Sequence, residues 1–63
     1  MNRYIESWDV IFLTEDGNVH DKMNFTTYED AEIYCMERDW TEVSEDGLIL
    51  YLDIKRKCEK VTA

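Results

Sequence analysis

Three side chains of this chain belong to the types that serve as nucleophile, base or metal ligand: His20, Cys35 and Cys58. A catalytic nucleophile needs a base within hydrogen-bond reach and a third group that orients the base. These three residues are far apart in the sequence and show no recognisable catalytic or zinc-binding spacing. The only two glycines lie in acidic turns, so there is no glycine-rich phosphate loop. The sequence therefore predicts no catalytic residue, no metal site and no cofactor, and it indicates a protein that is not an enzyme.

Cys35 and Cys58 are too few for a disulfide framework or a four-cysteine zinc site. We expect two reduced thiols, as is usual in cytosolic proteins. A single bridge between the helix that carries Cys35 and the C-terminal tail is the alternative.

Carboxylates are the most abundant chemical groups of the chain. Fifteen acidic residues face seven basic ones, which gives a net charge of −8. Residues 1–54 hold only three of the basic side chains and fourteen of the acidic ones. Such a charge disfavours direct contact with nucleic acid or an anionic membrane and suits docking on a basic protein surface. An acidic, well-solvated protein with no such partner is the alternative.

The acidic turn at Glu15-Asp16-Gly17 lacks the alternating oxygen ligands of a calcium loop. No apolar segment of signal-peptide type follows the N-terminus, and no run approaches the roughly 20 apolar residues that span a membrane. We therefore expect a cytoplasmic protein that does not contact membranes.

A helix from Tyr28 to Arg38 positions many of these carboxylates. Thr26 or Thr27 begins it, and the spacing of Thr26 and Glu29 is that of a capping box. Tyr28, Ala31 and Cys35 recur at helical spacing and should face a sheet. The opposite face carries Glu29, Glu32, Ile33 and Met36, a mixture of acids and apolar residues that is unusual for a solvated surface.

Carboxylates spaced along a surface can stand in for the phosphates of DNA, and apolar side chains beside them can anchor the partner. The candidate acidic stripe consists of Glu29, Asp30, Glu32, Glu37, Asp39 and Glu42. The candidate anchors are Ile33, Tyr34 and Met36, with Tyr28 behind them. We predict that the partner-binding residues are Tyr28, Glu29, Glu32, Ile33, Tyr34 and Met36.

The strands are indicated by alternation of apolar residues. The longest alternating run is Gly47–Arg56, which should lie centrally in the sheet. Ser7–Thr14 is a second strand, and the more polar Val19–Phe25, after an Asp-Gly turn of the tight primed type, is a third strand at an edge. Ile49 and Tyr51 fall on the face away from the helix, which would leave them exposed unless a second molecule covers them.

The predicted fold is α+β, with a three-stranded antiparallel sheet in ββαβ order and one helix packed on it. A short extra strand near Trp40–Val43 is possible. We expect residues 1–63 to form a single domain, with a loose N-terminus at 1–6 and a frayed tail at 57–63. A chain this short often needs a partner subunit to complete its core, so we expect a homodimer.

The first strand also resembles a known family. The run Tyr4-Ile5-Glu6-Ser7-Trp8-Asp9-Val10, followed by Phe12-Leu13 and Glu15-Asp16-Gly17, is similar to the start of the small uracil-DNA glycosylase inhibitors of podophages that infect Bacillus. The strand Leu48–Arg56 resembles the family's last strand in its alternation and its closing basic residues, and the order of elements agrees. The middle of the chain is similar in type of residue only.

The resemblance implies a dimer whose paired helices line a groove and which mimics DNA. In that family, the groove takes up the apolar side chain that the glycosylase wedges into the duplex, and acids beside it replace phosphates. Here Glu29 and Glu32 would be the phosphate stand-ins, and Tyr28 or Tyr34 would be the large aromatic residue of the helix.

The function expected from this resemblance is that of a phage protein that inhibits host uracil-DNA glycosylase in the cytoplasm of the infected bacterium. The expected partners are that enzyme and a second copy of the chain. The alternative is another acidic phage protein that binds host RNA polymerase or a CRISPR effector.

Overall fold

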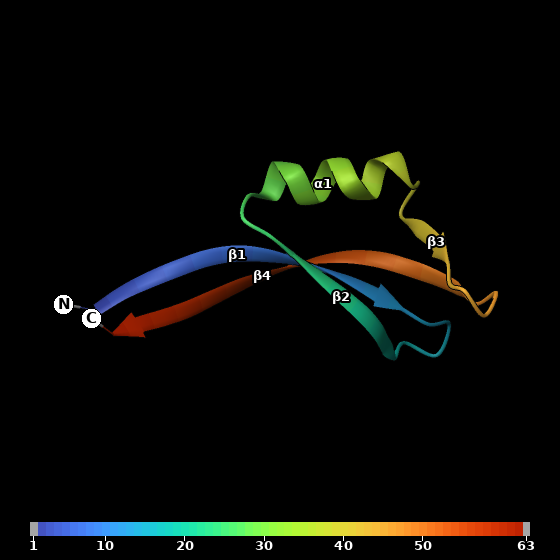
Figure 1. Cartoon of the computed structure of the whole chain (residues 1–63), viewed down its shortest axis with the longest axis horizontal. Coiled ribbons are helices and arrows are strands. Elements are labelled where there is room, and N and C mark those ends of the chain that lie inside the picture. Colours follow the sequence, from blue (N-terminus) through green and yellow to red (C-terminus); the bar gives the residue numbers. More distant parts are fainter. Residues whose placement is uncertain (1, 63) are drawn as a thin grey trace.

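A computed structural model describes residues 2–62 as one curved sheet with a helix on one side (Figure 1). The elements follow the order β1 (Asn2–Leu13), β2 (Val19–Phe25), α1 (Tyr28–Glu37), β3 (Thr41–Val43) and β4 (Ile49–Thr62). The strands are antiparallel and lie in the order β2-β1-β4-β3. The predicted α+β class is therefore confirmed. The possible extra strand is present as β3, so the sheet has four strands, with β4 in its interior and β2 at an edge as expected.

The two ends of the described chain are strands, and the expectation of a loose N-terminus and a frayed tail is wrong for residues 2–6 and 57–62. β1 and β4 pair along their whole length, from Asn2 opposite Thr62 to Leu13 opposite Tyr51. Residues 2–7 and 57–62 form a two-stranded ribbon that extends beyond the helix, and we call it the arm. The ion pair between Glu6 and Arg56 lies at its base. Residues 1 and 63 lie outside the described part.

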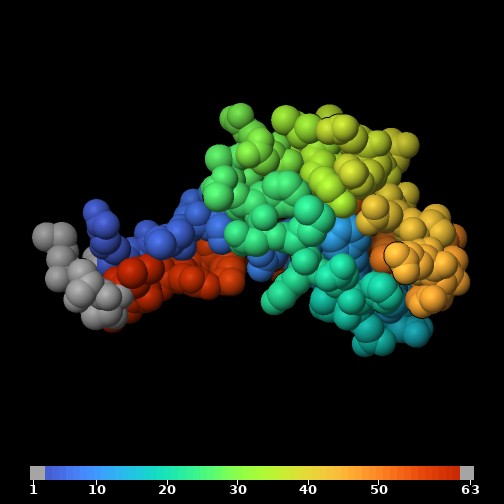
Figure 2. Space-filling model, viewed as in Figure 1, coloured from blue at the N-terminus to red at the C-terminus, as the bar shows by residue number. Residues whose placement is uncertain are grey.

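The arm makes the molecule long and thin. The described chain measures 47 × 22 × 16 Å, and Figure 2 shows the arm as a narrow extension from the bulk of the protein. The pairing of β2 with β1 begins only at Trp8, opposite Phe25, because the chain then turns away at Thr26 to enter the helix. The arm is thus a two-stranded ribbon, an arrangement of marginal stability in water when it stands alone.

Two hairpin turns of the same design join the strands. In both, a hydroxyl residue is followed by the run Glu-Asp-Gly, and the glycine has a φ of 84°. In the first turn the amide of Gly17 donates to the carbonyl of Thr14 at 2.9 Å, and in the second that of Gly47 donates to Ser44 at 2.9 Å. The loops are therefore longer than the expected tight primed turn, because the glycine takes the left-handed position that closes a three-residue loop.

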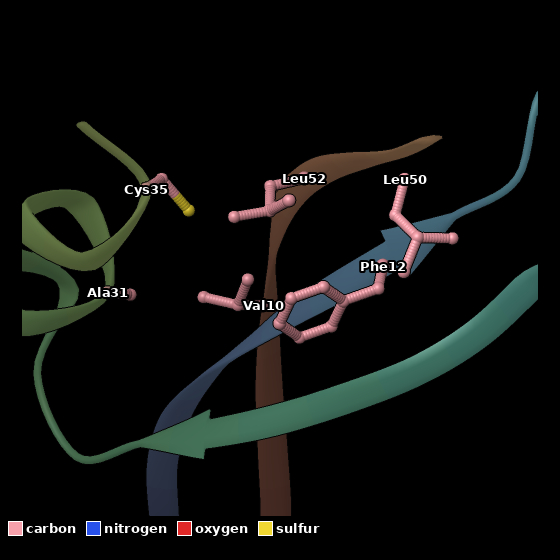
Figure 3. Packing of buried hydrophobic residues seen from close by; sticks show 6 residues of the cluster. All are labelled: Val10, Phe12, Ala31, Cys35, Leu50 and Leu52. Carbon is pink, nitrogen blue, oxygen red and sulfur yellow. The ribbon is translucent and has the colours of Figure 1, made fainter. Parts of the chain in front are cut away.

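The core lies between the helix and one face of β1 and β4 (Figure 3). Each strand contributes alternate residues to this face, as the sequence predicts. The buried residues of the described chain are Val10, Phe12, Ala31, Cys35, Leu50 and Leu52. Burial raises the pKa of the Cys35 thiol, with a further contribution from the charge of Asp53, so this cysteine is held neutral within the core.

Of the two threonines that the sequence offers as the start of the helix, Thr27 is the N-cap, and its hydroxyl accepts from the amide of Asp30 at 3.2 Å. The predicted capping box of Thr26 and Glu29 is therefore wrong. At the other end, the amide of Trp40 donates to the carbonyl of Cys35 at 2.8 Å, and that of Asp39 to Met36 at 3.1 Å. These two bonds form a Schellman motif in which Asp39 takes the position that usually favours glycine.

Replacing Asp39 with glycine should stabilise the protein. Asp39 has a φ of 53°, and its carboxylate lies at the negative end of the helix dipole. We expect Asp39→Gly to raise the free energy of unfolding by about 0.5–1 kcal/mol, since relief of backbone strain exceeds the added entropy of the unfolded chain. Thermal unfolding followed by circular dichroism measures the change. Asp16→Gly is the control, because Asp16 has no positive φ, and equal effects of the two substitutions would contradict this account.

Candidate protein-binding surface

Four of the predicted partner-binding residues lie together on the outward face of α1. Glu29, Glu32, Ile33 and Met36 are spaced three and four residues apart, which makes them neighbours on a helix surface. Ile33 is 54 % exposed and Met36 is 59 % exposed, while Glu32 is half-buried. We call these four residues the helix patch. It combines two carboxylates with two exposed apolar side chains.

Tyr28 lies beside the helix patch at the first turn of α1. Its ring packs edge-to-face on Trp8, with the ring centroids 6.3 Å apart, and 45 % of the residue is exposed. Tyr28 therefore packs on the sheet with only part of its side chain, whereas the sequence predicts that it faces the sheet. A shallow depression of about 480 Å³ lies between this pair and the start of the helix, bounded also by Glu6 and Glu29.

Tyr34 lies on the opposite flank of the helix and does not belong to the helix patch. The guanidinium of Arg38 stacks on one face of its ring, 3.6 Å from the centroid. The ring also packs against Phe25, at 5.4 Å between centroids, and against Phe12, at 6.3 Å. Tyr34 is thus half-buried at the edge of the core, and only part of it remains available to a partner.

A hollow of about 440 Å³ adjoins Tyr34, between the helix, β2 and β3. Its apolar lining includes Phe12, Met23 and Leu50 as well as Tyr34. Acidic residues also line it, and these are Asp21, Glu42, Glu45 and Asp46. The hollow is therefore concave and only partly apolar, and carboxylates border it.

Sequence reasoning did not find this hollow. His20 and Asp21 reach it because of an irregularity in the pairing of β1 with β2, where Phe12 lies opposite Asp21 and Leu13 lies opposite Val19. His20 is the extra residue of this bulge, which bends the strand. Glu42 enters the lining from β3, whose pairing with β4 places it opposite Leu50. The bulge at His20 and the position of Glu42 both depend on pairing between distant segments. The residue pattern of β2 alone therefore does not predict them.

Most of the helix carboxylates carry uncompensated charge. Among residues 2–62, the ion pairs are Arg38 with Glu42 at 3.7 Å, Lys57 with Glu59 at 2.9 Å, and Arg56 with Glu6. Two of these three pairs lie on or at the base of the arm. Within the described chain, the helix acids Glu29, Asp30, Glu32 and Glu37 have no ion-pair partner, so this side of the molecule presents a negative field to a basic partner.

The three residues with catalytic or ligating chemistry lie on different elements. His20 is on the bulge of β2, Cys35 is buried under α1, and Cys58 is exposed on the arm. Both cysteines are free, so the alternative of a bridge between helix and tail does not apply to this structure. In the part of the chain that the structure describes, no three histidine, cysteine or acidic side chains are grouped to hold a metal ion.

Comparison of the chain with models of protein families, with curated proteins and with solved structures finds no match. No helix within residues 2–62 has both the length and the apolar character needed to cross a membrane.

Proposed function

We propose that this protein inhibits a host uracil-DNA glycosylase during phage infection by occupying the DNA-binding groove of the enzyme. The observation that carries the proposal is the helix patch, where the exposed side chains of Ile33 and Met36 lie among carboxylates without ion-pair partners in the described chain. The proposal names uracil-DNA glycosylase as the enzyme because the first strand is similar to that of the inhibitors of Bacillus podophages. The protein acts by binding and performs no reaction.

Recognition rests on two physical terms. A groove that binds DNA is lined with lysine and arginine, and it attracts the carboxylates of Glu29 and Glu32 as it attracts phosphates. This attraction accelerates encounter and weakens as salt concentration rises. Ile33 and Met36 then supply the buried apolar contact that slows dissociation, since a few such residues dominate the energy of an interface.

The hollow beside Tyr34 is the proposed receptor for the apolar side chain that the enzyme wedges into DNA. Met23 and Tyr34 supply accessible parts of its apolar lining, whereas Phe12 and Leu50 are almost fully buried, and such a lining would contact an apolar side chain. The surrounding acids match the basic residues that accompany a DNA-inserting loop. We also propose that the protein acts as a homodimer.

The test is cleavage of uracil-containing DNA by the enzyme in the presence of the protein. We expect nearly complete inhibition once the protein is in several-fold excess, and inhibition should weaken at high salt. Unimpaired cleavage under these conditions would rule the proposal out. Capture of binding partners from a host lysate addresses the alternative, because RNA polymerase or a CRISPR effector would then be retained instead of the glycosylase.

A further inference from the structure

One edge of the arm has no neighbouring strand within residues 2–62. β3 pairs with β4 only at the first three residues of β4, and the next hydrogen bond on this side runs from the amide of Leu52 to the carbonyl of Trp40, at 2.9 Å. From Ile54 to Thr62, β4 pairs only with β1, on its other side. Figure 1 shows the arm extending beyond the other described elements. We call the outer side of β4 from Ile54 to Thr62 the free edge.

The strand pairing locates the hydrogen-bonding groups of the free edge. In a strand, the amide and carbonyl of one residue point to one side, and those of the next residue point to the other side. The amide of Leu52 points to the side of β3. The register of β4 with β1 is continuous, so the backbone groups of Ile54, Arg56, Cys58 and Lys60 point to that same side. Four successive donor and acceptor pairs are thus offered along about 20 Å.

The arm lacks a third strand. A ribbon of two strands is only marginally stable in water, and three or more strands are needed for independent stability. A row of unpaired amides and carbonyls is also the surface to which an extended peptide adds as a further strand. The outer side of β1 offers a shorter row, because β2 pairs with β1 from Trp8 onward. The free edge of β4 is therefore the part of the arm best suited to receive a strand.

The side chains along the free edge are mostly basic. Residues 55–62 carry four of the seven basic side chains of the protein and one acid, Glu59. All four bases are exposed, and the ion pairs of the described chain do not include Lys55 or Lys60. Asp9 lies opposite Lys55, whereas Tyr4 lies opposite Lys60. Lys60 is therefore the base that has the least compensation from neighbouring acids.

The acidic body of the protein does not cancel this local positive charge. Residues 1–54 carry fourteen acids and three bases. At physiological ionic strength the Debye length is about 8 Å, whereas the six residues from 57 to 62 extend over about 20 Å. Much of the negative field of the body is therefore screened along the arm, and an acidic segment is attracted there.

The same charges disfavour two other occupants of the free edge. Two copies of the free edge would repel each other, because each carries the same excess of bases. The outer strands of the described sheet supply no acidic segment, since β2 contains one acid and one base and β3 has three residues with one acid. Nucleic acid would leave the backbone groups without strand partners, and Arg56 and Lys57 already pair with Glu6 and Glu59.

We propose that the free edge binds an extended acidic segment of another protein, which adds to β4 as an antiparallel fifth strand. Hydrogen bonds to the backbone of Arg56, Cys58 and Lys60 fix the position of the segment. Acidic side chains at alternate positions of the segment contact the side chains of Arg56 and Lys60, which share one face of β4. The free edge lies outside the helix patch and the hollow, so this inference goes beyond the proposed function and does not depend on it.

The experiment measures binding of a fluorescein-labelled peptide to the whole protein by fluorescence anisotropy. The peptide has about eight residues, in which glutamate alternates with threonine. We expect saturable binding with a dissociation constant below about 1 mM, and weaker binding at high salt. The same peptide methylated at every backbone amide keeps its charge but cannot donate hydrogen bonds, so it should bind at least about tenfold more weakly. A short labelled DNA duplex should bind less tightly than the peptide.

Two substitutions separate backbone pairing from charge. Cys58→Pro removes an outward amide at the centre of the free edge and no hydrogen bond to β1, because proline is tolerated where the amide faces solvent. It should weaken peptide binding about tenfold, whereas Cys58→Ser should bind like the wild type. Lys60→Glu should also weaken binding about tenfold. Lys22→Glu makes the same change in net charge on an exposed residue outside the arm, and it should have little effect.

Hydrogen exchange shows where the peptide binds. At saturation, exchange of the amides of Arg56, Cys58 and Lys60 should slow about tenfold or more, while the amides of Lys57 and Glu59, which point toward β1, should change less. Faster exchange of these last two amides in Cys58→Pro would reveal a loosened arm, and Lys60→Glu against Lys22→Glu then decides the question.

Four outcomes would overturn the inference. They are no binding at several millimolar peptide, equal binding of the methylated peptide, unchanged affinity of Cys58→Pro with its arm still paired, and tighter binding of the DNA duplex. Inhibition of the glycosylase is measured separately. A protein that binds the peptide but does not inhibit the enzyme would contradict the proposed function alone, and an inhibitor that does not bind the peptide would contradict this inference alone.

Discussion

Replacing Phe12 with alanine should remove a large part of the stability of the folded protein. Phe12 is 4 % exposed, and its ring packs edge-to-face on Tyr34 within the buried cluster. Truncation of a buried phenylalanine costs about 3–5 kcal/mol through lost burial and the cavity left behind. A domain of this size has a stability of about 3–9 kcal/mol, so the loss removes a large part of the total. Urea unfolding followed by tryptophan fluorescence gives the change in free energy.

Tyr4→Ala is the matched control for this prediction. Tyr4 is an aromatic residue on the arm and is 67 % exposed, so its truncation should cost less than about 1 kcal/mol. The two variants should be compared at one protein concentration, since association stabilises the folded state by mass action. Equal losses for Phe12→Ala and Tyr4→Ala would show that the stability does not reside in the cluster under the helix.

The second large effect is expected at the helix patch. The double substitution Glu32→Lys with Met36→Ala reverses one charge and removes one apolar anchor, while both new residues favour the helix. We expect affinity for the glycosylase to fall about 100-fold, equivalent to about 2.8 kcal/mol, because a lost anchor and a new repulsion act together. Titration of enzyme inhibition against inhibitor concentration measures the change, and the melting temperature should stay nearly constant.

The arm supplies a matched control for this substitution. Ile5 and Glu59 lie opposite each other on β1 and β4, and Ile5 has an exposure of 56 %, close to that of Met36. Ile5→Ala with Glu59→Lys therefore makes the same change in net charge and removes a similarly exposed apolar side chain at a place remote from the helix. It also breaks the exposed ion pair of Glu59 with Lys57. If the two double variants weaken inhibition equally, net charge alone governs binding and the helix patch has no special role.

The elements that the sequence predicts well are those whose pattern is local. The alternation of Leu50 and Leu52 with Ile49 and Tyr51 follows directly from strand geometry, and it placed the first pair in the core and the second outside. The spacing of Ala31 and Cys35 likewise identified the buried face of the helix. In these segments, whether a side chain is buried or exposed follows from its spacing to residues nearby in the sequence.

The parts that sequence reasoning missed depend on pairing between distant segments. Residues 2–7 contain few apolar side chains in alternation, and they are ordered by residues 57–62 at the other end of the chain. The hollow beside Tyr34 arises from the bulge at His20 and from β3, which come together only in the folded sheet. For the candidate site, the sequence grouped Glu29, Glu32, Ile33 and Met36 correctly by helical spacing. The same spacing leaves Tyr34 outside that face. The sequence could not give the packing of Tyr34 against Phe12 and Phe25, because those two residues come from distant strands.

The pairing of Asn2 with Thr62 brings the two ends of the described chain to the same tip of the arm, far from the helix (Figure 1). A short linker between these ends, with a new opening cut in the turn at Asp16 and Gly17, would convert the fold into a circular permutant that keeps every strand pairing. A fluorophore or an affinity handle attached at either end would likewise point away from the helix patch and the hollow beside Tyr34, which makes the tip the natural place for immobilisation.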